Sequence, residues 1–164
     1  MISAILAVSE NGVIGKDGKL PWPHIPEDMK WFMNITLNNV VVMGSKTWFS
    51  LGIKKPLPNR LNYVVTTQPA SGFIEADGVI CGKNLCEELI GLALQHPQKD
   101  ITIIGGANIY NQCFPLCEKI YLTKVYGKYD GDTYIDMETV LQDFELQSEQ
   151  NVPNKCVIQV WVRK

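Results

Sequence analysis

A single carboxylate stands among aromatic residues in the helix predicted over residues 26–36. The segment reads PEDMKWFMNIT, and a period of about 3.6 residues puts Asp28 on one face with three large apolar side chains. These are Trp31, Phe32 and Ile35. Burial raises the pKa of a carboxyl, and such groups act as acid catalysts or bind cationic rings. Asp28 is therefore a candidate functional residue.

An ordinary role is also open to Asp28, because acidic residues favour the first turn of a helix through the helix dipole and through capping boxes. Two neighbours weaken that alternative. Ile25, three residues earlier, cannot supply the hydroxyl of a capping box, and Glu27 already provides first-turn charge on the polar face. Together they favour the functional interpretation.

Composition limits the class of protein. The chain has 164 residues, 46% hydrophobic and 20% charged, which predicts one globular domain over residues 1–164. Fifteen basic residues against seventeen acidic ones give no positive field for nucleic acid, so such a partner is disfavoured. The apolar run Ile2–Val8 is too short for a membrane span or a usual signal peptide, and we expect a cytoplasmic protein.

Cysteines and histidines give no support for a metal site. The cysteines are odd in number, contain no Cys-x-x-Cys motif, and are expected to be reduced structural thiols. They are Cys81, Cys86, Cys113, Cys117 and Cys156. His24 and His96 lie far apart and receive no role.

Short runs rich in Val, Ile and Tyr predict the strands. They are Ile2–Val8, Val40–Met43, Tyr63–Thr67, Val79–Cys81, Ile101–Ile104, Ile120–Val125 and Cys156–Val162. Helical stretches fall between them at 26–36, about 85–95 and about 107–113. This alternation predicts an α/β fold with a largely parallel sheet. The last two runs have no convincing helix between them, so we expect them to pair antiparallel at one edge.

Three connecting segments could bind a ligand. Residues 10–26 form a long loop rich in Gly and Pro, typical of a binding loop or lid. Residues 105–108 (GGAN) and 44–47 (GSKT) each join a strand to a helix, where free backbone amides suit phosphate groups. Neither has the spacing of a Rossmann fingerprint or of a P-loop.

These pieces follow one another in a specific order. They are Met1-Ile2-Ser3, Gly12-Val13-Ile14-Gly15, Leu20-Pro21-Trp22, Asp28 with Trp31-Phe32, Val42-Met43-Gly44, Thr47-Trp48, Pro56-Leu57-Pro58 with Arg60, Ile104-Gly105-Gly106, Tyr121-Leu122-Thr123 and Gly131-Asp132-Thr133. In this order and spacing the chain resembles the dihydrofolate reductases over nearly its whole length.

The resemblance implies an eight-stranded, mostly parallel mixed sheet with an antiparallel C-terminal edge and about four flanking helices. It implies an enzyme that transfers hydride from NADPH to the pterin ring of dihydrofolate, giving tetrahydrofolate for one-carbon metabolism and thymidylate synthesis. It also implies binding of antifolates such as methotrexate or trimethoprim, and we expect a monomer.

The same resemblance assigns the catalytic and substrate residues. Asp28, aided by Thr123, would hold the pterin, while Trp22 organises water and Leu20 closes over the reacting rings. Ile5 and Ile104 would offer carbonyls to the pterin amino group, and Arg60 would bind the glutamate carboxylate. The remaining expected substrate residues are Ala7, Met29, Phe32, Leu51, Leu57 and Tyr110. From the residues alone, Thr123 is an ordinary strand residue and Arg60 a charged turn residue.

For the cofactor, the resemblance implies a longer set. It comprises Ala7, Ile14, Gly15, Gly18, Lys19, Gly44, Ser45, Lys46, Thr47, Thr66, Thr67, Lys83, Gly105, Gly106, Ala107, Asn108, Ile109, Tyr110 and Gln112. The Gly105-Gly106 bond is expected to be cis. Ser45 and Asn108 stand where many relatives have a basic residue. The resemblance therefore leaves the 2′-phosphate of the cofactor to Lys46, Thr66 and Thr67. Residues 53–55 (IKK) also lengthen the loop before Pro56.

Two other functions remain open. One is a pyrimidine reductase of riboflavin synthesis on the same fold, which would not need the amidine-binding acid Asp28 together with Arg60. The other is a non-catalytic protein that binds a pterin or nucleotide, or has a structural role. The presence of Asp28, Trp22 and the Gly105-Gly106 turn disfavours it.

Overall fold

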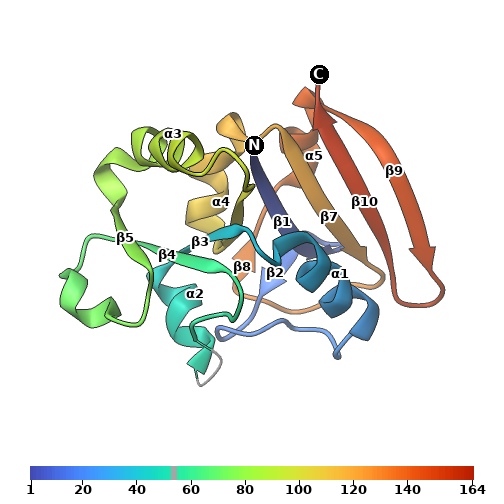
Figure 1. Ribbon diagram of the computed structural model, residues 1–164. Coiled ribbons are helices and arrows are strands. Elements are labelled where there is room, and N and C mark those ends of the chain that lie inside the picture. The colour runs from blue at the N-terminus through green and yellow to red at the C-terminus, as the bar shows by residue number, and fades with distance from the viewer. Residues whose placement is uncertain (53–54) are drawn as a thin grey trace.

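Eight strands form one sheet that runs across the molecule (Figure 1). Their spatial order is β5 (Gly78–Cys81), β4 (Leu61–Thr66), β3 (Val40–Gly44), β6 (Ile101–Gly105), β1 (Ile2–Ser9), β7 (Lys119–Val125), β10 (Cys156–Arg163) and β9 (Phe144–Val152). All pairs from β5 to β7 are parallel, and β10 is antiparallel to both of its neighbours. A separate antiparallel pair joins β2 (Val13–Gly15) to β8 (Thr133–Tyr134). This computed structural model describes residues 1–52 and 55–164.

Helices cover both faces of the sheet (Figure 1). They are α1 (Pro26–Thr36) and α2 (Ser45–Ser50) on one face, and α3 (Leu85–Gln95), α4 (Ala107–Cys113) and α5 (Met137–Val140) on the other. The two-residue period of a strand divides the core between them. In β3, Val40 and Val42 pack with residues of α3 and α4, whereas Val41 and Met43 pack with Trp48 of α2.

The predicted antiparallel pairing of the last two apolar runs is confirmed, but β10 is not the edge of the sheet. The edge strand is β9, which the sequence analysis missed. Its sequence FELQSEQNV is exposed throughout between two buried ends, because an edge strand has few neighbours to pack against. The short α5 was also missed; Asp136 caps it by accepting a 3.2 Å hydrogen bond from the Thr139 backbone N–H.

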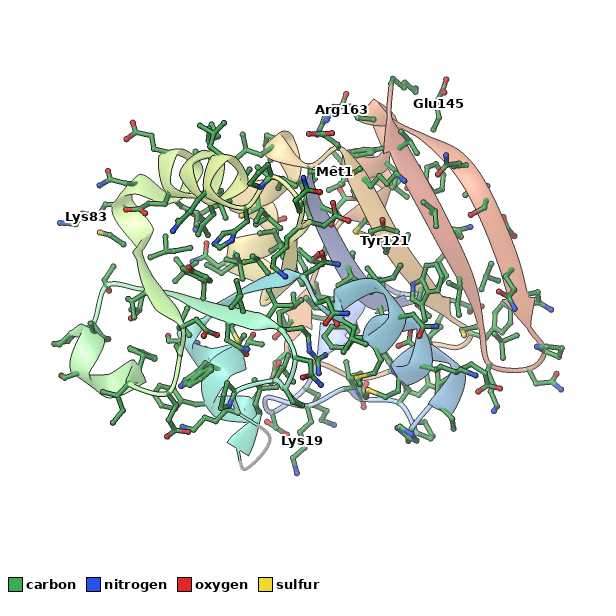
Figure 2. All side chains as sticks on the ribbon, viewed as in Figure 1. Met1, Lys19, Lys83, Tyr121, Glu145 and Arg163 are labelled. Atoms are coloured by element: carbon green, nitrogen blue, oxygen red, sulfur yellow. The ribbon has the colours of Figure 1, made fainter. Side chains whose placement is uncertain are left out.

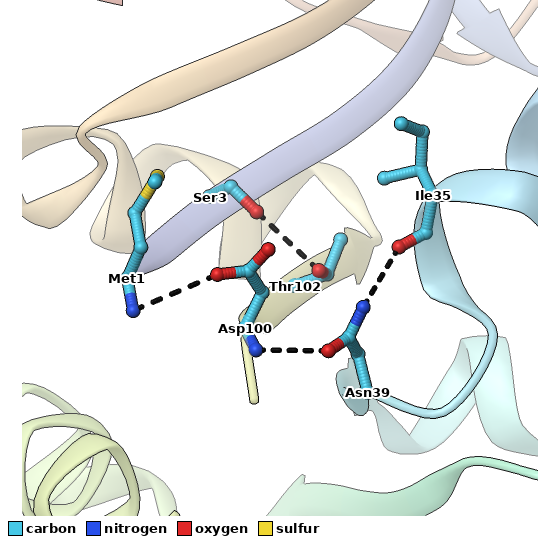
Figure 3. A network of polar contacts seen from close by, with 6 residues as sticks. All are labelled: Met1, Ser3, Ile35, Asn39, Asp100 and Thr102. Atoms are coloured by element: carbon cyan, nitrogen blue, oxygen red, sulfur yellow. Dashed lines mark hydrogen bonds and ion pairs between the residues drawn. The ribbon is translucent and has the colours of Figure 1, made fainter. Parts of the chain in front are cut away.

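Helix α1 is tied to the rest of the fold at both ends. At its C-terminal end, the Asn39 side chain donates to the Ile35 carbonyl at 3.0 Å and accepts from the Asp100 backbone N–H at 2.9 Å (Figure 3). At its N-terminal end, Lys155 Nζ lies 3.0 Å from Glu27 Oε1. These contacts hold the helix across the sheet, so the residues on its inner face have fixed neighbours.

The cysteines are all free. Burial raises the pKa of the Cys113 and Cys117 thiols to about 12 and that of Cys156 to about 11, which makes them poor nucleophiles at neutral pH. Among the residues that the structure describes, no helix has both the length and the apolar composition needed to cross a bilayer.

Candidate active site

The Asp28 carboxylate meets a hydroxyl of the sheet. Thr123 Oγ1 donates to Asp28 Oδ1 at 2.6 Å, and Thr123 is only 1% exposed. Strand alternation places Thr123 on the α1 face of β7, while Leu122 points into the opposite core. Burial raises the pKa of Asp28, and the hydrogen bond from Thr123 partly opposes that shift. A carboxyl in this setting can accept strong hydrogen bonds from a cationic or two-donor ligand.

The first turn of α1 agrees with the functional interpretation of Asp28. Ile25 at the N-cap makes no side-chain capping bond. Glu27 is exposed and paired with Lys155, so the ordinary first-turn charge is on the outer side. Asp28 is half-buried instead, as the helical period predicts.

Trp22 and Leu20 come from the long loop before α1, but they differ in burial. Trp22 is 6% exposed and packs in a cluster that includes Ala7 and Trp31. Leu20 is 53% exposed and lines the mouth of a large cleft. The loop therefore provides one fixed aromatic wall and one side chain that is free to cover a ligand.

Arg60 is held in place by hydrogen bonds to neutral groups. It is 8% exposed; its Nε donates to the Pro58 carbonyl at 2.9 Å, and its Nη1 donates to Thr36 Oγ1 at 3.1 Å. Met33 Sδ lies 3.6 Å from the same Nη1. Within residues 1–52 and 55–164, no carboxylate forms an ion pair with Arg60. Its charge is thus oriented and available for an acidic ligand.

The other expected substrate residues fall into three places. Leu51, Leu57 and Ile104 pack in one apolar cluster with Trp48. Tyr110 is buried, its pKa is raised well above the usual range by burial, and its Oη donates to the Ile5 carbonyl at 2.7 Å. Phe32 and Met29 lie on α1, where Phe32 is half-buried and Met29 is 45% exposed.

A cleft of about 1080 Å³ runs along the carboxyl ends of the parallel strands. Every residue that the sequence analysis expected at the cofactor lines it, from Ala7 and Ile14 to Tyr110 and Gln112. Its lining also includes Leu20 and Ile104. The cleft is adjacent to the acid site, because Ala7 is the register partner of Thr123 on the neighbouring strand.

Two glycine turns open into this cleft from the adjacent strands β3 and β6. Gly44 caps α2 and Gly106 caps α4; neither cap makes a side-chain hydrogen bond, and neither helix has an acid in its first turn. The Gly105-Gly106 peptide is cis, as expected. A Cβ on Gly44 would lie 3.1 Å from Ile109 Cγ1. These bare amides fit a pyrophosphate that approaches the backbone closely.

Basic and hydroxyl groups lie at the other end of the cleft. Lys46, Thr66 and Thr67 line it, and Thr66 Oγ1 also accepts from the Gln68 backbone N–H at 2.9 Å. Lys83 extends outward at the rim, and Lys19 points away from the body of the protein (Figure 2). The set fits a ligand with phosphates at one end and a planar ring near Ala7 at the other.

The loop before Pro56 is only partly described. Ile53 and Lys54 lie outside the described residues. The Lys55 ammonium lies 5.0 Å from the centre of the Phe49 ring and 5.5 Å from that of Trp48. Lys55 is thus held near aromatic residues at the end of α2.

Comparison with known proteins identifies the family. A family model described as dihydrofolate reductase matches residues 1–161. The chain belongs to the dihydrofolate reductase family. Dihydrofolate reductase of Bacillus subtilis is 39% identical over 134 residues, covering 82% of this chain and 74% of that one. The Haemophilus influenzae enzyme is 36% identical over 155 residues, covering 91% of both.

A solved structure agrees with this assignment. Dihydrofolate reductase from Enterococcus faecalis, complexed with NADP(H) and RAB-propyl, superposes with a TM-score of 0.81 at 30% identity. The match covers 99% of this chain and 96% of that one. The expected eight-stranded dihydrofolate reductase fold is therefore confirmed.

Sequence reasoning missed two groups in this dihydrofolate reductase-family site. Asp132 and Thr133 line the cleft, and Asp132 Oδ2 accepts from the Asp17 backbone N–H at 2.8 Å, which ties the long loop down. Gly131-Asp132-Thr133 belonged to the resemblance, but spacing gave these residues no role.

The second missed residue is Asn62, which is fully buried. Its side-chain Oδ1 accepts from the Leu57 backbone N–H at 2.9 Å. Its Nδ2 donates to the Leu57 carbonyl at 3.0 Å and to the Arg60 carbonyl at 3.1 Å. It thereby shapes the segment that carries two expected substrate residues. An asparagine inside the apolar run LNYVVT was the available signal.

Proposed function

We propose that this protein reduces dihydrofolate to tetrahydrofolate with NADPH, and so supports one-carbon metabolism and thymidylate synthesis. The observation that carries the proposal is the Asp28–Thr123 hydrogen bond, one strand away from the cofactor cleft. A half-buried carboxylate with a raised pKa is suited to a planar cationic edge such as that of a pterin.

Dihydrofolate would extend from Asp28 to Arg60. Its pterin edge would donate hydrogen bonds to the Asp28 carboxylate. Thr123 would hold that carboxylate in place through its own hydrogen bond to Asp28 Oδ1. The carbonyls of Ile5 and Ile104 would accept from the pterin amino group. Arg60 would bind the glutamate carboxylate, since Thr36 and Pro58 already orient its guanidinium. Phe32, Leu51 and Leu57 would enclose the rings between these charges.

NADPH, when bound, supplies the hydride. Ala7 and Tyr110 would pack beside the nicotinamide, and the amides of the Gly105–Ala107 turn would hold the pyrophosphate. Lys46, Thr66 and Thr67 would hold the 2′-phosphate, in the absence of a base at Ser45.

The chain itself orients the substrate and excludes water. Leu20 would close over the reacting rings, and Trp22 would hold the water next to Asp28 through which a proton reaches the pterin ring nitrogen. The Asp28 carboxylate keeps the pterin in a protonatable form by accepting its hydrogen bonds.

The test is the fall in NADPH absorbance on adding dihydrofolate, with and without methotrexate, repeated with NADH. We expect the wild-type protein to oxidise NADPH and methotrexate to block this oxidation. Asp28→Asn should lower the oxidation rate by about 10²-fold at neutral pH, with partial recovery at lower pH where the substrate arrives protonated. Glu27→Gln, which alters the exposed neighbouring acid, is the matched control and should keep its activity. Full activity of Asp28→Asn contradicts the role of that carboxylate, and tight methotrexate binding without turnover indicates a binding protein.

Four further properties belong to this proposal. We propose one catalytic domain over residues 1–164, because strands from the first to the last residues share one sheet. We also propose a monomer that acts in the cytosol, where NADPH is available and free cysteines stay reduced. Methotrexate and trimethoprim would compete with dihydrofolate at Asp28.

A further inference from the structure

Trp22 has an aromatic neighbour from a distant part of the chain. The ring of Tyr129 meets the Trp22 indole edge to face, with 5.9 Å between ring centres and 69° between planes. Trp22 lies between Pro21 and Pro23, whereas Tyr129 lies in the connection between β7 and β8. Aromatic pairs in this geometry prefer a defined orientation over simple contact.

The backbone of Tyr129 is fixed by the side chain of Asn11. Asn11 Nδ2 donates to the Tyr129 carbonyl at 2.9 Å, and its Oδ1 accepts from the Tyr129 backbone N–H at 3.1 Å. Ser9 Oγ also donates to Asn11 Oδ1 at 2.6 Å and accepts from the Val13 backbone N–H at 3.0 Å. The side-chain amide of Asn11 therefore pairs with both the N–H and the carbonyl of Tyr129, as the backbone of a neighbouring β-strand would.

The Tyr129 ring is also restricted on another side. Gly127 has a φ of +101°, and a Cβ at that position would lie 3.3 Å from Tyr129 Cε2. The glycine lets the ring lie against the backbone. The Tyr129 hydroxyl has no hydrogen-bond partner among the described residues, so the ring and not the hydroxyl makes the contact with Trp22.

We infer that Tyr129 and Asn11 are positioning residues for hydride transfer, because they set the orientation of the Trp22 indole. The inference rests on the proposed function, in which Trp22 organises the water beside Asp28. Neither residue lines the cofactor cleft, so they act through Trp22 and not on the cofactor. Small displacements of such a group lower the rate without lowering affinity.

The experiment compares Tyr129→Leu, Tyr129→Phe and Asn11→Ala in single-turnover hydride transfer and in the indole N–H spectrum. Trp22→Phe identifies the Trp22 resonance among those of the four tryptophans. Tyr129→Leu and Asn11→Ala should move that resonance and slow hydride transfer by about 2- to 10-fold, the range of an edge-to-face contact, with NADPH affinity unchanged. Tyr129→Phe keeps the ring, so its Trp22 resonance and its rate of hydride transfer should match those of the wild type.

The matched control is Tyr126→Leu, three residues away in the same connection, where the exposed tyrosine bonds Asn151 instead. It should change neither readout. In a Trp22→Phe background, Tyr129→Leu should have no further effect on the rate, since its influence passes through the indole. Effects that multiply in the double variant, or a Trp22 resonance that ignores Tyr129→Leu, overturn the inference. A wild-type protein that does not reduce dihydrofolate refutes the proposed function instead, while the resonance still reports on Trp22.

Discussion

At the scale of single residues, Asp28 illustrates how a functional group can lower the stability of its own fold. Its carboxylate is half-buried on the helix face that carries Trp31 and Phe32, and among the described residues the Thr123 hydroxyl is its one side-chain hydrogen-bond partner. In the unfolded chain the same carboxylate is fully hydrated. Because the folded pKa is raised, the folded protein binds more protons than the unfolded chain at intermediate pH. The stability linked to this group is therefore present at low pH and lost as the pH rises through the folded pKa.

Asp28→Asn should accordingly raise the melting temperature of the ligand-free protein at neutral pH, although it lowers activity. The gain should shrink as the pH falls and vanish below the ordinary aspartate pKa of about 3.9, where the wild-type carboxyl is protonated in both states. Thermal unfolding of both proteins over a pH series measures it. Glu27→Gln should give no such gain, because its ion pair with Lys155 lowers the pKa of Glu27 instead. A destabilised Asp28→Asn protein at neutral pH would show that the carboxylate is compensated by groups other than Thr123.

Arg60 is the second residue with a separable role. Arg60→Leu should weaken dihydrofolate and methotrexate binding by about 10²-fold, the usual effect of removing one partner of a buried charged pair, and leave NADPH binding unchanged. Titration calorimetry with each ligand measures both constants. Lys30→Gln, on the exposed side of α1, is the matched control. An equal loss of affinity for the substrate and for NADPH would show that Arg60 supports the stability of the fold and does not bind the substrate.

At the scale of elements, the pair β2–β8 connects the long loop to the cleft. Gly131, just before β8, packs so closely that a Cβ would lie 2.2 Å from Val13 Cγ1 and 2.7 Å from the Gly15 carbonyl. The Gly15 carbonyl itself accepts from the Asp132 backbone N–H at 3.1 Å. This small region therefore determines where the loop lies.

Gly131→Ala should displace the loop and destabilise the protein by about 1–3 kcal/mol, as overpacking does elsewhere. Affinity for NADPH should fall with it, because Ile14 and Gly15 line the cleft. Denaturant unfolding and NADPH titration measure the two effects. Gly91→Ala in α3 is the control: nothing lies within 4 Å of its added Cβ, and it should stabilise the helix by about 1 kcal/mol. A Gly131→Ala protein with unchanged NADPH affinity would mean that β2–β8 does not control the loop.

The elements also show what the sequence could and could not predict. Runs such as Val40–Met43 and Ile101–Ile104 were predictable because strands buried on both faces are almost wholly apolar. The polar edge strand β9 has no such pattern. Asp28 could be found from helical period alone, whereas Arg60 needed the resemblance, because its orientation depends on Thr36, which is 24 residues away. Asp132 acts through a backbone contact that no local pattern encodes, whereas the position of Asn62 inside an apolar run was a local signal that did not reveal its partners.

At the scale of the whole molecule, the cofactor cleft draws its lining from most of the chain, from Leu6 to Thr133. A ligand that binds there binds the folded state alone. At a concentration 100 times its dissociation constant it should stabilise the protein by about 2.7 kcal/mol.

NADPH should therefore raise the melting temperature, and NADH at equal concentration should raise it less, because only NADPH carries the 2′-phosphate for Lys46. Differential scanning fluorimetry with both cofactors measures the gap. Lys46→Gln should remove most of that gap while leaving the response to NADH in place. If the difference in melting temperature between NADPH and NADH is the same in Lys46→Gln and in the wild type, other residues of the cleft, such as Thr66 or Lys83, distinguish the two cofactors.

The dispersed origin of the cleft has a consequence for the protein in the cell. Proteases act on chains that have opened, and the fraction of open chains falls as the native state is loaded with ligand. Because no part of the chain can form the cleft alone, a ligand in the cleft protects each copy from turnover only as a whole. The abundance of the protein would then rise with the total supply of this cofactor at a constant rate of synthesis.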